Sequence, residues 1–166
     1  MPVELYLVRH AIAAERGPEW PDDARRPLTE RGIQRFREEV AGLRTLDVAI
    51  QEVISSPLVR AKQTADLLAA GLDGKPVVRI LKALEPGHSP TTVISQVARL
   101  ARRSKIAIVG HEPDLGELAA HLVGASRPLP FRKGSVCRID LESFTSRHAG
   151  SLIWFVTPKM LRQLGG

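Results

Sequence analysis

Short apolar runs alternate with amphipathic stretches along most of the chain. Residues 3–8 (VELYLV) and 105–110 (KIAIVG) are almost continuously apolar, which is typical of strands that are buried on both faces. In residues 28–44 the apolar side chains instead recur every three to four positions, at Ile33, Phe36, Val40 and Leu43. That spacing indicates a helix with one buried face, and Thr29 is a suitable N-cap for it.

The same two patterns predict ten elements in all. Six strands are expected over residues 3–8, 52–56, 76–80, 105–110, 134–143 and 149–158. Four helices are expected over residues 28–44, 57–72, 90–103 and 113–124. For the second helix, Ser56 is the expected cap and Pro57 the expected first-turn residue.

The alternation of strands and helices predicts the fold class. Strands joined by helices are typical of a mostly parallel sheet with helices on both faces. The last two strands are separated by a short polar segment, so we expect them to form an antiparallel hairpin. The sequence therefore predicts a single α/β domain over residues 1–166, with three layers and a central mixed sheet.

The composition favours a water-soluble protein of a reducing compartment. Hydrophobic residues make up 43% of the chain and charged residues 25%, as in ordinary globular domains. The single cysteine, Cys137, has no partner within the chain for a disulfide, and its apolar surroundings predict a place in the core. The amino terminus has no signal-peptide pattern and no apolar window approaches about 20 residues, so we expect a cytoplasmic protein without membrane contacts.

The charge balance bears on the class of partner. The chain has 24 Lys and Arg against 18 Asp and Glu, a net charge of +6, which favours anionic partners such as phosphorylated molecules. Aromatic residues are only 4% of the chain, so stacking surfaces for bases are scarce and no nucleic-acid partner is expected. No feature of the sequence calls for self-association, and a monomer is expected.

Four polar residues stand where predicted strands end or the next helix begins. Arg9 and His10 follow the first strand, His111 follows the strand over 105–110, and Arg60 lies in the first turn of the second helix. Ligands of open α/β sheets bind at the carboxyl ends of the strands. We therefore expect these residues to meet at one edge of the sheet, near the polar loop over residues 14–27, although a histidine after a strand is often only structural.

This combination of side chains points to phosphoryl transfer. Two guanidinium groups suit phosphate oxygens, and an imidazole can attack phosphorus or carry a proton. The four residues are not accompanied by a cluster of carboxylates or an H-E-x-x-H spacing, so no metal site is expected. A reaction without metal or other cofactor remains, in which the arginines hold the phosphoryl oxygens and one imidazole acts as the nucleophile.

Four segments together resemble the histidine phosphatase superfamily, and in particular its short SixA-type phosphohistidine phosphatases. They are LVRHA (7–11), RPLTERG (26–32), SSPLVRAKQTA (55–65) and VGHEPDLG (109–116). The resemblance implies that His10 is the nucleophile and that His111 also contacts the phosphoryl group. It further implies that Arg9, Arg26 and Arg60 bind phosphate.

The sequence departs from the family pattern at two places. Ala11 follows the Arg-His pair, where the family usually has glycine; one extra methyl group should leave the chemistry intact. Many members also carry a glutamate that protonates the leaving group, and Glu85 is the candidate here, with an exposed loop carboxylate as the alternative. A phosphohistidine substrate reduces the need for such an acid, because its leaving imidazole can already carry a proton.

Three functions remain open from the sequence. The first is a metal-independent phosphatase that removes phosphate from phosphohistidine on a protein. The second is a phosphomonoesterase acting on a small phosphorylated metabolite, and the third is a phosphate-binding module without catalysis. The presence of both histidines beside both arginines favours an enzyme, and nearby guanidinium groups should keep His10 neutral by lowering its pKa. Lys133, in the segment FRKGSV, is expected either to line the pocket or to be an exposed lysine in a turn.

Overall fold

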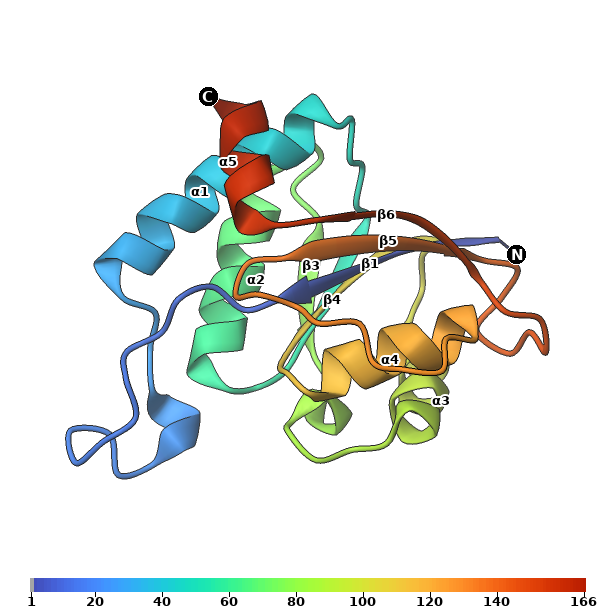
Figure 1. Ribbon diagram of the computed structural model, residues 1–166, viewed down its shortest axis with the longest axis horizontal. Coiled ribbons are helices and arrows are strands. Elements are labelled where there is room, and N and C mark those ends of the chain that lie inside the picture. Colours follow the sequence, from blue (N-terminus) through green and yellow to red (C-terminus); the bar gives the residue numbers. More distant parts are fainter. Residues whose placement is uncertain (1) are drawn as a thin grey trace.

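A six-stranded sheet with helices on both of its faces forms the protein (Figure 1). The computed structural model describes residues 2–166. The strands are β1 (Val3–Arg9), β2 (Glu52–Ser55), β3 (Val77–Ile80), β4 (Lys105–Gly110), β5 (Val136–Leu141) and β6 (Ser151–Val156). The α-helices are α1 (Glu30–Thr45), α2 (Val59–Gly71), α3 (Pro90–Leu100), α4 (Asp114–Val123) and α5 (Pro158–Gly165).

The strand order confirms the mixed sheet expected from the sequence. The order is β3-β2-β4-β1-β5-β6, with parallel pairs from β3 to β1. Strand β5 runs antiparallel to β1, and β6 runs antiparallel to β5, which confirms the C-terminal hairpin. Strands β1 and β4 are therefore neighbours at the centre, and both carry a histidine directly after their carboxyl ends.

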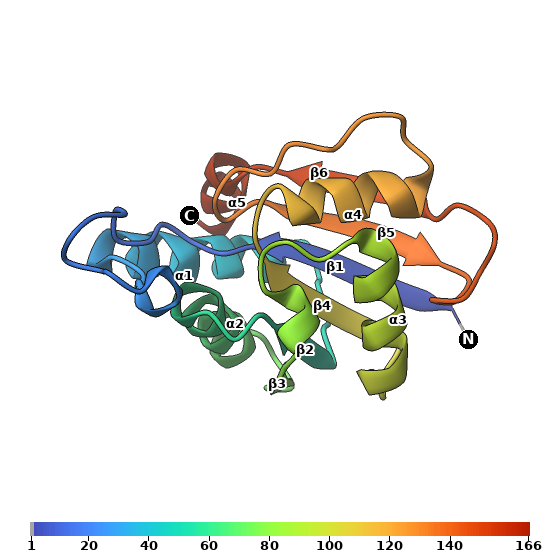
Figure 2. The same cartoon turned by 90° about the horizontal axis from the view of Figure 1, so that it is seen from below.

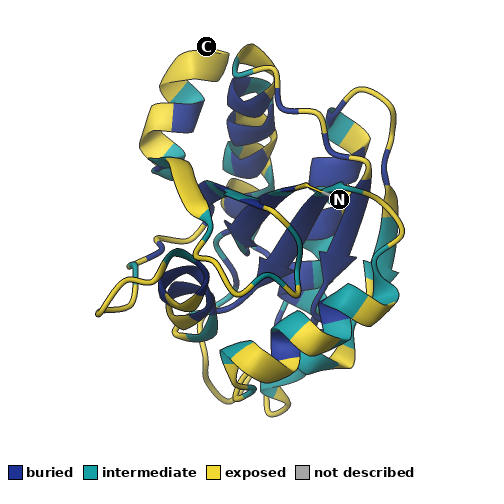
Figure 3. Ribbon diagram, turned by 90° about the vertical axis from the view of Figure 1, so that its right-hand side faces the viewer, coloured by how far each residue is buried: buried dark blue, intermediate teal, exposed yellow. Residues whose placement is uncertain are grey.

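Alternate residues of β1 face two separate cores. Tyr6 and Val8 belong to a buried apolar cluster with α1, α2 and α5, whereas Leu5 and Leu7 belong to a second cluster with α3 and α4. This follows from the two-residue period of a strand that is covered on both faces. Figure 2 shows the two groups of helices on either side of the sheet, and Figure 3 shows the buried residues gathered between them. The three-layer arrangement holds the ends of β1 and β4 firmly in place.

The expected bounds of some helices were wrong in detail, and one helix was not expected. Helix α3, for example, ends at Leu100 rather than at residue 103. Helix α2 begins at Val59 rather than at residue 57, and Ser56 does not cap its first turn. The hydroxyl of Ser56 instead accepts a hydrogen bond from the backbone of Leu58 at 3.2 Å and also bonds a histidine described below. The final strand ends at Val156, and residues that were assigned to its end open helix α5, which the sequence analysis did not predict.

The remaining expectations for the core are met. Cys137 is fully buried, and burial raises the pKa of its thiol to about 12, which makes it unreactive. Thr29 caps α1, accepting a hydrogen bond from the backbone of Gly32 at 2.9 Å. Within residues 2–166, none of the helices combines the length and the apolar character needed to cross a bilayer.

Candidate active site

A cavity of about 460 Å³ lies at the carboxyl ends of β1 and β4. Five of the six site residues expected from the sequence line it: Arg9, His10, Arg26, Arg60 and His111. The parallel pairing of β1 with β4 places Arg9 opposite Gly110, so the two histidines that follow these positions emerge side by side. The polar loop over residues 14–27 contributes further lining residues, as expected for a substrate-facing loop.

The two histidine rings lie close together and His10 has a defined orientation. Their ring centroids are 5.3 Å apart with an angle of 54° between the ring planes. The Nδ1 of His10 lies 2.7 Å from the backbone oxygen of Ala11. A carbonyl can only accept, so Nδ1 must carry the proton and donate it. The other ring nitrogen, Nε2, therefore carries the free electron pair.

Both imidazoles are neutral near pH 7. Burial is the main reason why the pKa of His10 falls to about 3, and the charges of His111, Arg60 and Arg9 lower it further. The hydrogen bond to the Ala11 carbonyl acts in the opposite direction but is outweighed. Burial also lowers the pKa of His111 to about 4, and Arg60 adds to the effect. A neutral His10 is the form that can act as a nucleophile.

Ser56 holds the second histidine. Its hydroxyl lies 2.8 Å from the Nε2 of His111, and both residues are buried. The remaining nitrogen of His111, Nδ1, is buried without a hydrogen-bond partner. One nitrogen of this ring is therefore held by the protein, and the other has no hydrogen-bond partner within residues 2–166. The sequence analysis treated Ser56 only as a helix cap and missed this contact.

Asp23 orients two of the arginines. Its carboxylate accepts a hydrogen bond from Arg26 Nε at 3.1 Å and from Arg60 Nη2 at 3.0 Å, and its backbone oxygen accepts one from Arg60 Nη1 at 2.8 Å. Arg26 also donates to the backbone oxygen of Ala14 at 2.6 Å. Burial alone would raise the pKa of Asp23, but the hydrogen bond from Arg26 and the charge of Arg60 outweigh it and lower that pKa. Asp23 is therefore an ionised anchor for both guanidinium groups.

A turn after α4 supports Arg9 and the backbone of the nucleophile. The Nη1 of Arg9 donates to the backbone oxygen of Phe131 at 2.7 Å. The amide of Gly134 donates to the backbone oxygens of Arg9 and His10, at 3.1 and 3.2 Å. Gly134 has a φ of +87°, a conformation that glycine adopts without strain. The neighbouring Lys133 lines the cavity, and burial together with the charge of Arg9 lowers its pKa.

Three buried polar atoms at this cavity lack a partner. They are Arg9 Nε, Arg60 Nε and His111 Nδ1; in the part of the chain from residue 2 onward, only one other buried side-chain atom shares this condition. Leaving a buried donor unpaired costs about 1–3 kcal/mol, and buried polar groups are normally satisfied. Both guanidinium Nε atoms always carry hydrogen. The arrangement is therefore suited to an anion with several acceptor oxygens.

The carboxylates of the cavity differ from the one expected. Glu85 is not among the lining residues, although its neighbour Pro86 is. The carboxylates that line the cavity belong to Glu15, Asp23 and Glu112. Both oxygens of Glu112 accept backbone amides, from Gly116 at 2.7 Å and Phe131 at 3.2 Å. The role expected for Glu85 as an acid remains a prediction.

The donor set of the cavity does not resemble a metal site. Among the residues the structure describes, no group of three or more His, Cys, Asp and Glu side chains is arranged to hold a metal ion. Guanidinium groups cannot ligate a cation, and they dominate this cavity.

The methyl group of Ala11 is buried, and the amide of Ala11 donates to the hydroxyl of Thr64 at 3.0 Å.

Comparisons with known proteins agree with one another. The model of the histidine phosphatase superfamily (branch 1) matches residues 5–85. An uncharacterised protein of Picosynechococcus sp. is 39% identical over 119 residues, which cover 70% of this chain and 71% of the relative. The phosphohistidine phosphatase SixA of Escherichia coli (strain K12) is 25% identical over 162 residues, covering 96% of this chain and 97% of the relative. A solved structure of the protein histidine phosphatase SixA complexed with tungstate has a TM-score of 0.83 at 24% identity, covering 96% of this chain and 99% of that one.

Proposed function

This chain belongs to branch 1 of the histidine phosphatase superfamily, and we propose that it is a metal-independent phosphatase with His10 as its nucleophile, acting on phosphohistidine of a protein. One observation carries the proposal. A neutral imidazole, with its proton fixed on Nδ1, lies in a cavity where two arginine Nε atoms and one nitrogen of His111 have no partner. A phosphoryl group supplies the oxygens that these donors lack and the phosphorus that Nε2 can attack.

The arginines bind and orient the phosphoryl group. Arg9 and Arg60 each offer an unpaired Nε donor. Phe131 holds Nη1 of Arg9, and Asp23 holds both Nη atoms of Arg60. Arg26 adds positive charge and is itself fixed by Asp23 and the backbone oxygen of Ala14. Donors that are held in position before the substrate binds stabilise the developing charge without reorganising.

Two displacements complete the reaction. In the first, Nε2 of His10 forms a bond to phosphorus while the bond between phosphorus and the substrate imidazole breaks, and that imidazole leaves. In the second, water attacks the phosphorus on His10, the bond to Nε2 breaks, and orthophosphate departs with the neutral imidazole restored. The proton stays on Nδ1 throughout, where it is donated in the hydrogen bond to the Ala11 carbonyl oxygen. His111 stabilises the charge on the transferring group, since its Nδ1 has no other partner.

The state of Asp23 favours phosphohistidine over a phosphate ester. An alkoxide leaving group needs a proton from an acid whose pKa is raised, but neighbouring arginines lower the pKa of Asp23. A departing imidazole does not need that help. The naming of the Escherichia coli relative as a phosphohistidine phosphatase supports the same substrate class.

The first test concerns the nucleophile. We expect turnover of an aryl phosphate to persist in excess chelator, with a trapped phosphoenzyme that is acid-labile and alkali-stable. His10→Ala should abolish the phosphoenzyme and reduce turnover by about 1,000-fold or more. His121→Ala, which removes an exposed imidazole from α4, is the matched control and should behave as the parent protein. A phosphoenzyme that survives in His10→Ala would refute the assignment.

The second part of this test concerns the substrate. A protein phosphorylated on histidine is compared with a set of phosphorylated metabolites, and kcat/KM is measured for each. We expect the phosphohistidine protein to be the better substrate by about 100-fold, because its imidazole can leave without a proton from an acid. A metabolite that is hydrolysed more efficiently would identify the chain as a small-molecule phosphomonoesterase.

A further inference from the structure

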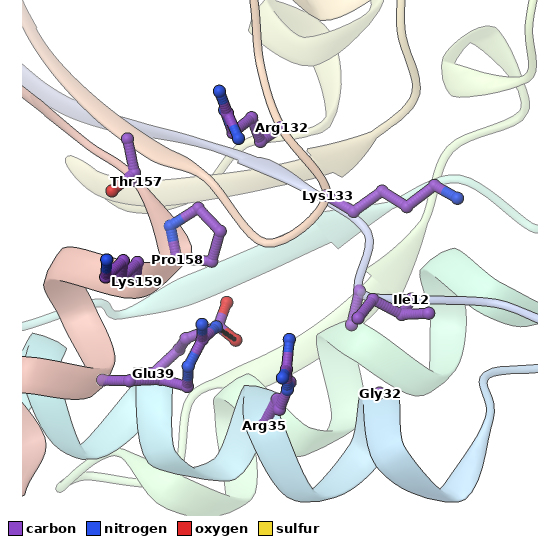
Figure 4. Close-up of a pocket in the computed structure, with 11 residues that line it drawn as sticks. Ile12, Gly32, Arg35, Glu39, Arg132, Lys133, Thr157, Pro158 and Lys159 are labelled. Carbon is purple, nitrogen blue, oxygen red and sulfur yellow. Dashed lines mark ion pairs between the residues drawn. The ribbon is translucent and has the colours of Figure 1, made fainter.

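The structure has a second cavity, of about 470 Å³, which Figure 4 shows. It is formed by α1, the turn that contains Lys133 and Gly134, and the start of α5. The two cavities border one segment of chain, since His10 lines the first whereas Ala11 and Ile12 line the second. Lys133 lines both. A ligand held in the catalytic cavity therefore has the second cavity next to it.

The second cavity is rich in cations that have no fixed partner. It is lined by Arg35 of α1, Arg132 and Lys133 of the turn, and Lys159 and Arg162 of α5. In the described residues, Arg162 is the only one of the five in an ion pair, at 3.5 Å from the carboxylate of Glu39. The other four line the cavity and form no ion pair within residues 2–166. The charge pattern predicts an anionic occupant.

Glu39 forms the floor of this cavity and does not cancel its charge. Its side chain rises from α1 toward the turn and Pro158 in Figure 4, and the residue is only 3% exposed. Its Oε1 is the fourth buried side-chain atom without a hydrogen-bond partner. Burial raises the pKa of Glu39 to about 8, although Arg162 acts against the shift. Even as an ion-paired carboxylate, Glu39 offsets only one of the five cations, so the cavity keeps an excess of positive charge.

We propose that the second cavity binds a carboxylate side chain of the protein that carries the phosphohistidine, close in sequence to the phosphorylated residue. This rests on the proposed function of the catalytic cavity. A chain in extended conformation advances about 3.3 Å per residue, so two cavities with a shared wall lie within the reach of a few residues. The enzyme therefore favours phosphohistidine with Asp or Glu nearby over the same residue in a neutral sequence.

The chemistry of the cations favours a carboxylate side chain as the occupant. Arg132, Lys133 and Lys159 are exposed, and no acceptor fixes their geometry, in contrast to the arginines of the catalytic cavity. Flexible cations suit the variable position of a carboxylate on a polypeptide better than they suit one rigid small ligand. The start of α5, capped by Thr157, adds its positive end to the same wall.

The test compares two short synthetic peptides that carry one phosphohistidine each. In one, the flanking residues are glutamates; in the other, glutamines replace them. We measure kcat/KM for both with the parent protein, with Arg35→Gln/Lys159→Gln, and with Arg31→Gln/Arg37→Gln. The last variant is the matched control. It removes two charges from exposed positions of α1, the helix that also carries Arg35, and neither position lines the cavity.

We expect the parent protein to prefer the acidic peptide by about tenfold. In Arg35→Gln/Lys159→Gln the preference should fall to about twofold or less, and in the control variant it should persist. Equal rates on both peptides with the parent protein would overturn the proposal while leaving the proposed function intact. A preference lost to the same extent in the control would also overturn it, because attraction by the net charge would then explain the effect. If neither peptide is hydrolysed, the proposed function itself fails.

Discussion

The two cavities beside the end of β1 have similar volumes and opposite construction. In the catalytic cavity, Arg26 and Arg60 are only 6% and 2% exposed, and Asp23 fixes both. In the second cavity, Arg132 and Lys159 are exposed and unpaired in the described structure, above a buried carboxyl group. Fixed donors select one geometry, which suits a transferring phosphoryl group. Exposed cations without a fixed partner attract negative charge but do not fix its position, which suits the recognition of many related sequences.

The largest effect is expected from replacing the guanidinium group that Asp23 holds in the catalytic cavity with the ammonium group of a lysine. Arg60→Lys keeps the charge of the catalytic cavity but removes the donors to Asp23 and the unpaired Nε. We expect kcat/KM for an aryl phosphate to fall by about 100- to 1,000-fold, roughly 3–4 kcal/mol. Arg37→Lys, on the exposed face of α1, should leave it unchanged. A loss of less than about threefold would mean that charge suffices in both cavities.

The second effect concerns the buried carboxyl group of the second cavity. The pKa of Glu39 is about 8 in the folded protein against an ordinary value of 4.5, so the folded state holds the proton more tightly than the unfolded chain. The free energy of unfolding must then fall as the pH rises between these two values. Glu39→Gln cannot lose a proton and should gain about 3 kcal/mol over the parent protein between pH 5 and pH 8.

Denaturant titrations at a series of pH values measure this gain. Glu38→Gln provides the control, because it changes the neighbouring carboxyl group on the exposed side of α1. A difference between Glu39→Gln and the parent protein that does not vary with pH would show that Glu39 is ionised throughout.

The smallest effect has the opposite sign and arises in the catalytic cavity. The pKa of His111 is about 4 in the folded protein against an ordinary value of 6.5, so the unfolded chain binds the proton more tightly. Each such histidine removes stability as the pH falls through 6.5 toward its folded pKa, and His10 behaves in the same way. His111→Gln should recover about 2 kcal/mol of the loss between pH 7 and pH 5.

The same denaturant titrations test this, with His148→Gln as the control at an exposed position. If His111→Gln loses as much stability on acidification as the parent protein, the ring is protonated in the folded state.

Much of the fold was predictable because its signals are local. The strand over residues 105–110 was predicted with its observed bounds, and α1 begins after the expected cap Thr29. Helix α5 was missed although Thr157 and Pro158 are typical of a helix start, because the apolar run of β6 continues up to them. The start of α2 was misplaced because Ser56 bonds His111, a residue distant in sequence.

The strand ends predicted one part of the site, and the family resemblance predicted Arg26 as well. Arg9, His10 and His111 follow directly from the rule that ligands bind at the carboxyl ends of parallel strands. The anchoring role of Asp23 depends on a contact with Arg60, which is 37 positions away in the sequence, and no local pattern predicts that contact. The second cavity likewise requires α5, so an analysis that lacked this helix could not have found it.

Gly134 lies in the turn that the two cavities share, next to Lys133, which lines both. A methyl group built on the Cα of Gly134 would clash with Oε1 of Glu39, and the amide of Gly134 holds the backbone oxygens of Arg9 and His10. A larger residue here would displace the Glu39 side chain in the second cavity. It would also disturb the turn whose amide holds the backbone of His10 in the catalytic cavity. A residue that touches no substrate thus constrains, in a single position, how far either pocket can be redesigned without damaging its neighbour.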